Sequence, residues 1–419
     1  MKRLTHDSGQ TLIFVALGMS VLLGFAAFAT DIGVMLHERD KAQTAADSAA
    51  IAGAKSLHYG AASVQAAAIR DASLNGFTDG SNGVTVTVSN PPTTDQVGNA
   101  IFAAKGYVKV SILENTPGFF MRVFGINAMP VAASATATNG APSQNCFYIV
   151  NPSAPDAMNL QGSFDVSVPD CGIVIDSTSS DALHFQGAAG HLTAGSVEVV
   201  GGDSGQTGDS TPAPVLGVAS QADPLSWEPT QTVPNTGCTG SGNYTLTGTA
   251  TAGCYGDGTG TITLSNVQLG AGLYIFNGPV SLSGSVTGTG VTLYLANGGL
   301  SATTNSTLDL VAPTSATPTN PYNGILIDDQ GTNTIELEMG NATGTLTGVM
   351  YAPNAQLYVH DSGGDSSGGT GVTGTNALDL NVDLVVNTFN DQTGDLTINP
   401  YSKTFGAGTS PLTKVTLVE

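Results

Sequence analysis

The sequence predicts a mainly β protein, in which a right-handed parallel β-helix (a solenoid) follows an N-terminal transmembrane helix and a small α/β stalk module. Two observations predict this fold class. Leu12 to Thr30 is an uncharged, mostly apolar run, and after Cys146 short apolar clusters recur with Gly, Asn, Ser and Asp between them. Amphipathic helical patterns are missing between these clusters, which argues against a doubly wound α/β sheet. An array of immunoglobulin-like sandwiches is the alternative.

The apolar run is the first element. It is about 19 residues long, enough to cross a hydrocarbon core of roughly 30 Å, and we assign residues 1–36 to a cytoplasmic tip and this transmembrane helix. A cleaved signal peptide is the alternative, since Ala26-Ala27-Phe28-Ala29 resembles a small-residue cleavage site. The run stays apolar as far as Leu36, beyond the length of a secretory signal, and this favours an uncleaved anchor.

Charges on either side of the run bear on its orientation. Lys2 and Arg3 precede it, and the positive-inside rule then places the N-terminus in the cytoplasm. Arg39 and Lys41 follow the run and oppose this assignment. Asp31 lies near the outer end of the span, where it is either an interfacial carboxylate that faces water or a polar contact within an assembly.

Residues 37–80 are predicted to form a helical stalk with one face of small side chains. On a helical wheel this face contains Ala42, Ala45, Ala46, Ala49, Ala52, Gly53 and Ser56. Small residues let another element approach a helix closely. The face, with Ala42, Ala46, Ala49 and Gly53 as its packing residues, therefore packs on the protein's own first domain or docks partner helices.

Residues 81–140 are predicted to form the small α/β module. Three runs predict strands, at Val84–Val88, Tyr107–Ile112 and Val131–Thr138. Thr116-Pro117 predicts the start of a short helix at Gly118–Phe124, because Pro is favoured in the first helical turn.

Residues 141–419 carry the repeated clusters and are predicted to form the solenoid. Its first segment is residues 141–200, and its second is residues 261–419 with the tail, each coil burying apolar residues against its neighbours. Residues 201–260 have few strand signals and are predicted to be an insertion or strap between the two segments.

The four cysteines fit an oxidising compartment. Three pairings are possible, and the spacing favours one of them. Cys146 and Cys171 are about one coil apart, so they would occupy equivalent corners of stacked coils, near the separation that a disulfide needs. Cys238 and Cys254 would then close a short loop in the insertion. No close Cys or His spacing of the kind found in metal sites is present, so no cofactor is expected.

The charge of the chain is distributed unevenly. The formal net charge is −21, yet no Lys or Arg lies between Val123 and Ser402, where Asp and Glu are frequent. Such a stretch cannot make the phosphate contacts that dominate nucleic-acid affinity. We therefore expect no nucleic-acid partner for this region.

Two short motifs resemble catalytic or metal-binding sites. Gly202-Asp203-Ser204-Gly205 matches a serine-protease tetrapeptide but lies in a low-complexity loop, with only His184, His191 and His360 beyond the stalk as bases. Asp176-Ser177-Thr178-Ser179-Ser180 resembles the metal-dependent adhesion site of von Willebrand A domains, but the helices that this fold requires are not predicted. We interpret the first motif as part of a low-complexity loop and the second as a solenoid corner.

Two groups of acidic residues suggest two further kinds of site, a hydrolase active site and a Ca²⁺ site. Asp328-Asp329 follows a predicted strand, and polysaccharide hydrolases use grouped carboxylates as acid and nucleophile or base. Asp361-Ser362-Gly363-Gly364-Asp365 offers oxygen ligands of the kind that Ca²⁺ prefers. Surface carboxylates at solenoid turns are the simpler interpretation of both.

The N-terminal residues resemble a known family. Gly9-Gln10, the apolar span, Asp31-Ile32-Gly33 and then Gln43 to Ala54 are similar to the N-terminal region of TadE/TadG-like proteins, which belong to the bacterial tight-adherence (Flp-type) pilus assembly system. Pseudopilin members of that system place a Glu five residues after a cleaved Gly, where this chain has Phe14. The resemblance is therefore to the large, uncleaved TadG-type member.

A second resemblance, to the C-terminal region of TadG-like proteins, is carried by short stretches in a matching order. They are Asn145-Cys146-Phe147, Pro169-Asp170-Cys171-Gly172, Asp223-Pro224-Leu225, Leu269-Gly270-Ala271-Gly272-Leu273-Tyr274-Ile275, Val311-Ala312-Pro313 and Gly348-Val349-Met350-Tyr351-Ala352-Pro353.

These resemblances imply a non-enzymatic scaffold, anchored in the inner membrane by one helix, with its C-terminal bulk periplasmic or extracellular. Its partners would be other pilus assembly or membrane proteins. The alternatives are a surface adhesin, whose solenoid contacts a glycan or a surface, and a β-helical glycan hydrolase.

Overall fold

The structure is a computed structural model that describes residues 8–93, 106–162, 164–186, 190–205, 210–234, 237–317, 319–339, 342–360, 378–392, 395–401 and 410–418. The protein is mainly β with an N-terminal apolar helix, as the sequence predicts. It divides into two compact units, of which unit 1 is Met1–Ala141 with Val415–Glu419 and unit 2 is Pro142–Lys414. Unit 2 is therefore inserted into the chain between two parts of unit 1.

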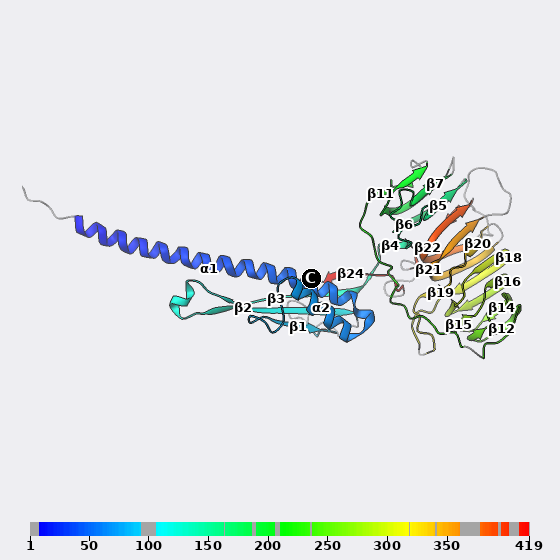
Figure 1. Ribbon diagram of the computed structural model, residues 1–419, viewed down its shortest axis with the longest axis horizontal. Helices are drawn as coiled ribbons and strands as arrows, with labels where there is room; N and C mark the ends of the chain where they lie inside the picture. Colours follow the sequence, from blue (N-terminus) through cyan, green and yellow to red (C-terminus); the bar gives the residue numbers. More distant parts are fainter. Residues whose placement is uncertain are drawn as a thin grey trace, which may run out of the picture. The chain divides into compact units, whose positions relative to one another are not determined.

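Unit 1 combines two helices with a four-stranded sheet (Figure 1). Its elements are α1 (Ser8–Lys55), the 3-10 helix η1 (Leu57–Tyr59), α2 (Ala61–Leu74), β1 (Thr85–Ser89), β2 (Tyr107–Pro117), the 3-10 helix η2 (Met121–Phe124), β3 (Ala128–Pro142) and β24 (Thr413–Val418). The strand order is β1-β2-β3-β24, and β2 is antiparallel to both β1 and β3. The last strand of the chain thus completes the sheet that the N-terminal residues begin.

The core of unit 1 forms where the C-terminal half of α1 packs against α2 and the sheet. Fully buried alanines of α1 make this contact, namely Ala42, Ala45, Ala46, Ala49, Ala50 and Ala54. They share a cluster with Val64 of α2 and Val108 of β2. A Cβ at Gly53 would lie only 3.0 Å from Val108 Cγ1. The small face therefore packs on the protein's own domain, where larger side chains would separate the helix from the sheet.

One local prediction is wrong. Thr116 and Pro117 do not begin a helix but end β2, whose pairing with β3 continues as far as Pro117 and Ala128. Only the short turn η2 remains at the tip of the hairpin. The long-range ladder supplies hydrogen-bond partners for this backbone, and that outweighs the local preference of Pro for the first turn of a helix.

Unit 2 is built from strands, the shortest of two residues and the longest of 19 (Figure 1). They are β4 (Asn145–Ile149), β5 (Met158–Gln161), β6 (Asp165–Ile175), β7 (Leu183–Phe185), β8 (His191–Val199), β9 (Asp203–Gly205), β10 (Ser210–Thr211), β11 (Val215–Leu216), β12 (Tyr244–Ala250), β13 (Gly253–Tyr255), β14 (Ile262–Leu269), β15 (Gly272–Phe276), β16 (Val280–Thr289), β17 (Val291–Leu295), β18 (Leu300–Val311), β19 (Ile325–Asp329), β20 (Ile335–Glu338), β21 (Ala342–His360), β22 (Leu378–Gln392) and β23 (Asp395–Thr397).

The pairings described between these strands are parallel, and most join strands two apart in the chain, such as β12 with β14 and β14 with β16. Such strands form a row, called the stack, in which each strand pairs with the strand two places before it and with the strand two places after it. One row of buried residues is aligned in register through the stack and is at most 1% exposed: Tyr274, Leu293, Ile327, Met350, Leu384, Phe147, Ile173 and Val197.

The first strand of unit 2 lies inside the stack and not at its end. β4 pairs with β6 on one edge and with β22 on the other, where Phe147 is opposite Leu384. From β4 the chain continues through β6 and β8 to β10 and β11. It then crosses to β12 and returns through β14, β16, β18 and β21 to β22.

The crossing segment, residues 217–234, covers one outer face of the stack and is called the strap. Leu225 is fully buried in a cluster with residues of that face. The hydroxyl of Tyr351 donates to Asp223 Oδ2 at 2.8 Å, and the hydroxyl of Tyr322 donates to the carbonyl oxygen of Pro229 at 2.6 Å. The strap is thus held by apolar burial and by hydrogen bonds to β21 and to the segment between β18 and β19.

The strap occupies only part of the predicted insertion at residues 201–260. Before it, β9 pairs with β7, and β10 and β11 pair with β8. After it, β12 and β13 pair with β14 and β15. These strands are short or rich in Gly and Thr, so their local sequence carries little strand signal although the stack gives them partners.

Candidate functional site

The N-terminal part of α1 exposes its apolar side chains. Leu12, Leu22 and Phe25 are each at least 70% exposed. The most apolar 18-residue window of this helix has no buried residue, whereas a core helix of a soluble protein would be covered. By length and composition, α1 is able to cross a membrane.

Asp31 lies between this exposed part of α1 and the part that is buried in unit 1. Its side chain is only 1% exposed. The carboxylate accepts backbone N–H groups from Phe119 at 3.1 Å, from Phe120 at 3.0 Å and from Met121 at 2.7 Å. Asp31 therefore does not face water but makes a polar contact within its own chain.

The local backbone explains why these donors are available. The first N–H groups of a helical turn have no partner within the turn, and η2 begins just after the ladder between β2 and β3 ends. Asp31 caps this turn from a position 88 to 90 residues earlier in the sequence. Hydrogen bonds to an ionised carboxylate are among the stronger ones in proteins, so the contact holds the end of the hairpin against α1.

Residues 118–127 form the end of this hairpin and are called the hairpin tip. Phe119 is 66% exposed, Val123 is 83% exposed and Phe124 is 84% exposed. Arg122 is exposed beside them. The sequence predicts a short helix here and no role for it; the signal that could have indicated one is the group of phenylalanines, Phe119, Phe120 and Phe124, around Arg122.

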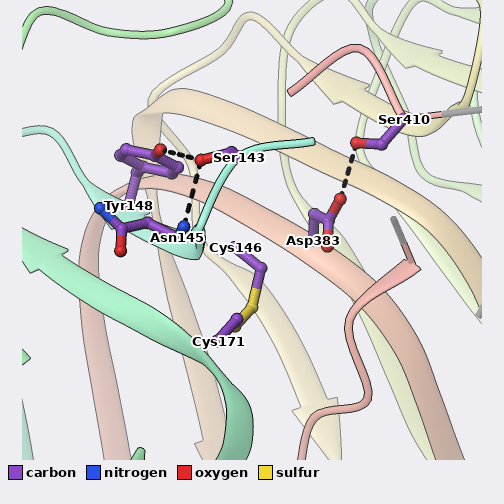
Figure 2. The surroundings of a disulfide bond; sticks show 7 residues. All are labelled: Ser143, Asn145, Cys146, Tyr148, Cys171, Asp383 and Ser410. Atoms are coloured by element: carbon purple, nitrogen blue, oxygen red, sulfur yellow. Dashed lines mark hydrogen bonds between the residues drawn. A yellow bond between two sulfur atoms is a disulfide. The ribbon is translucent and has the colours of Figure 1, made fainter. Parts of the chain in front are cut away.

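Two disulfides lie in unit 2 in the pairing that the spacing favours, Cys146 with Cys171 and Cys238 with Cys254. The first joins the neighbouring strands β4 and β6 at a Cα separation of 5.8 Å. Figure 2 shows this bond, and also Ser410, near the exit of the chain from unit 2, which donates to Asp383 Oδ2 at 2.7 Å. The disulfide therefore joins the first strand of the unit covalently to β6.

The paired carboxylates Asp328 and Asp329 are buried and not displayed at the surface. Both are 0% exposed. Asp329 accepts the N–H of Gly331 at 2.8 Å, and Asp328 is aligned between Tyr294 and Tyr351 on the face that the strap covers. A glycan would have to displace the strap to reach Asp328.

The protease-like motif at residues 202–205 places a serine near a histidine and an aspartate. The hydrogen bond between serine and histidine that catalysis requires is not among the described contacts. Ser204 on β9 is in register with His184 on β7, and His184 Nδ1 lies 2.7 Å from Asp156 Oδ1. In the part of the chain that the structure describes, no hydrogen bond joins Ser204 to His184, so a nucleophile and its base are not paired.

The other predicted sites have structural partners or cannot be located. Asp176 accepts the backbone N–H of Gln221 in the strap at 2.8 Å, and Ser177 donates to the carbonyl oxygen of Ala154 at 2.6 Å. These side chains thus join the segment that follows β6 to neighbouring segments. The predicted Ca²⁺ cluster at residues 361–365 lies outside the described residues.

Comparison with known proteins identifies the N-terminal segment. Residues 9–56 match the family described as Putative Flp pilus-assembly TadE/G-like. This segment is therefore similar to the TadE/G-like family. The match covers α1 almost from end to end, so the apolar surface, Asp31 and the small face all lie within the matched segment. No curated protein and no solved structure matches the chain.

Acidic groups in the strap and in β19 make the stability of unit 2 depend on pH. Burial, and then the Asp328 charge, raise the pKa of Glu228 to about 8. Burial also raises the pKa of Asp328 to about 7 and that of Asp329 to about 6. The folded state therefore binds more protons than the unfolded chain between about pH 4 and about pH 8, and its stability falls as the pH rises through this window.

We expect Asp328→Asn to weaken this pH dependence, because the amide does not titrate. The Asp328 carboxyl should account for a loss on the order of 2–4 kcal/mol between about pH 4 and about pH 8. Urea unfolding of the full chain, followed by the circular dichroism of the β-sheet at several pH values, measures it. Asp170→Asn, at an exposed side chain, is the matched control. A pH profile that Asp328→Asn leaves unchanged would contradict burial as the cause.

We expect Asp31→Asn to release the hairpin tip. The amide keeps the size of the side chain, but it loses the charge and turns an NH₂ group toward backbone donors. Losing hydrogen bonds to a charged group costs about 1.5–3 kcal/mol, which corresponds to roughly tenfold or faster hydrogen exchange at the released amides. Exchange at Phe119, Phe120 and Met121, measured for the full chain in detergent micelles, tests this.

The matched control for the tip is Asp40→Asn, an exposed carboxylate on the same helix. It should leave the exchange of the tip amides at the wild-type rate. Equal rates in wild type and Asp31→Asn would show that the tip is held by something other than this carboxylate.

Proposed function

We propose that the protein is a membrane-anchored scaffold component of a Tad/Flp-type pilus assembly or surface apparatus. The observation that carries the proposal is the TadE/G-like domain at residues 9–56, which supports a role in Flp pilus assembly. The exposed apolar part of α1 supports a single-pass anchor. Other pilus assembly proteins and membrane proteins are the proposed partners.

The anchor crosses the inner membrane once in this proposal, with the N-terminus in the cytoplasm and both units on the periplasmic or extracellular side. The two disulfides of unit 2 support an oxidising compartment. Lys2 and Arg3, whose charges favour this orientation, lie outside the described residues.

We infer that unit 2 is a right-handed parallel β-helix. Parallel pairing between successive coils supports this, as when β14 and β15 pair with β16 and β17. The row of buried residues that runs in register through the stack also fits a solenoid core. The right hand follows from the strong preference of parallel crossover connections.

The proposed role is structural and not catalytic. Asp328 lies beneath the strap, Asp329 accepts the N–H groups of Gly299 and Gly331, and Asp176 binds the strap, so these carboxylates serve the fold. Resident cofactors form no part of the proposal, and Ca²⁺ binding at residues 361–365 stays a prediction.

A surface adhesin is the second candidate, and one observation favours it. Hydroxyl side chains are aligned in register on one outer face of the stack, at Thr245, Thr263, Ser281 and Ser301. Such a row could donate hydrogen bonds to a glycan. A hydrolase has no comparable support, since the grouped carboxylates are buried.

Excision of unit 2 distinguishes the scaffold from the adhesin. Because β3 and β24 are neighbours in the sheet of unit 1, residues 144–411 can be replaced by a short Gly/Ser linker that leaves this sheet complete. Expressed in cells that lack the protein, the excised chain should reach the membrane but fail to restore pili. The full chain from the same plasmid is the control. Restored pili with loss of surface attachment alone would contradict the scaffold and support the adhesin.

A further inference from the structure

We propose that the hairpin tip inserts into the lipid interface beside α1 and gives unit 1 a second attachment to the membrane. This inference rests on the proposed role of α1 as a membrane span. The tip consists of residues 118–127, and its exposed apolar side chains are those of Phe119, Phe120, Val123, Phe124 and Ile126. On a domain surrounded by water, such a cluster at the end of a hairpin would be unfavourable.

The position of Asp31 places the tip at the edge of the bilayer. Asp31 follows Leu12 by 19 residues, which at 1.5 Å per residue corresponds to about 28 Å of helix, close to the thickness of the hydrocarbon core. Since Asp31 binds the backbone of Phe120 and Met121, the tip lies beside α1 at this depth. Figure 1 shows the hairpin of β2 and β3 extending along α1 within unit 1.

The apolar surface of the tip continues that of α1. Ile32 is 38% exposed and Leu36 is 55% exposed, so the helix still presents apolar side chains beyond Asp31. A bilayer that covers the helix from Leu12 onward would therefore meet both surfaces together. This continuity is the reason to assign lipid, and not another protein, as the occupant.

Backbone N–H groups of the tip form hydrogen bonds within the protein, as a medium without water requires. Unpaired N–H groups are costly in lipid, so a segment that enters it must satisfy them internally. Asp31 accepts from Phe119, Phe120 and Met121, while Val123 donates to the carbonyl oxygen of Phe120. The N–H groups of Gly118, Gly125 and Ile126 also donate to carbonyl oxygens within the tip.

The composition of the tip fits an anionic interface. Apolar and aromatic side chains enter the boundary of the acyl chains, and the exposed guanidinium of Arg122 can reach the phosphates of the headgroups. The 280 residues from Val123 to Ser402 contain no Lys or Arg, so Arg122 is the last cation before an acidic stretch that anionic lipid would repel. The tip is therefore the part of this region suited to contact the membrane.

Tryptophan fluorescence in brominated lipid tests the insertion directly. The full chain, with its one tryptophan removed by Trp227→Phe, is placed in vesicles of phosphatidylcholine and phosphatidylglycerol with brominated acyl chains. One tryptophan is then introduced at a time: Phe124→Trp in the tip, Phe14→Trp in the span as the positive control, and Tyr59→Trp at a 60% exposed site of unit 1 as the matched negative control.

The inference predicts that the tryptophans at positions 124 and 14 emit at short wavelength and lose most of their fluorescence to bromine, while the one at position 59 does not. Quenching at 14 without quenching at 124 would overturn the insertion of the tip and leave the anchor in place. Emission from 124 that is shifted to short wavelength but unquenched would mean that protein covers the tip, which also overturns it. No quenching at 14 would instead contradict the proposed anchor itself.

Discussion

Unit 1 depends on one continuous helix, α1, whose N-terminal part exposes apolar side chains and whose C-terminal part is buried in the protein. Asp31 lies at the transition between the two parts. An α-helix satisfies its own backbone, so α1 can leave an apolar medium and enter a protein core without a break. The side chains then decide what covers each part: large apolar residues are exposed before Asp31, and alanines are buried after Ala42. The carboxylate of Asp31 is the group that needs a partner at this point, and the β2–β3 hairpin supplies its backbone N–H groups. Helix and hairpin are thereby fixed to each other at the end of the apolar surface.

The topology of unit 2 imposes a second constraint, because its first strand lies inside the stack. Phe147 of β4 is paired with Leu384 of β22. The sheet is therefore continuous across β4 only when β22, which comes late in the chain, has paired with it. Both chain connections of unit 2 lead to unit 1, through β3 and β24. The strap is a product of the same route, since the chain must pass from one end of the stack to the other. The buried carboxylate of Asp328, which lies beneath the strap, is best explained as part of this contact.

Much of the fold follows from local sequence. The parts that local sequence does not predict are those that depend on distant partners. The apolar run, the β-rich class and the favoured cysteine pairing were predictable, because length, spacing and composition determine them. The partner of Asp31 was not, since its donors lie some 90 residues away. Thr116 and Pro117 were misassigned because a helix-start signal is local, whereas the pairing of β2 with β3 is not. The small face around Ala49 required a close neighbour, but the sequence could not say whether that neighbour was this chain or another.

The central claim is that α1 is a retained membrane anchor that displays both units on one side of the membrane. It is tested most directly by fractionating native cells, sequencing the N-terminus of the protein and measuring protease access to units 1 and 2. The account predicts an intact N-terminus in the inner membrane, with both units cleaved only after the outer barrier has been opened. A new N-terminus near Thr30 on soluble or released protein would contradict it, because the exposed apolar helix would then be a removed signal.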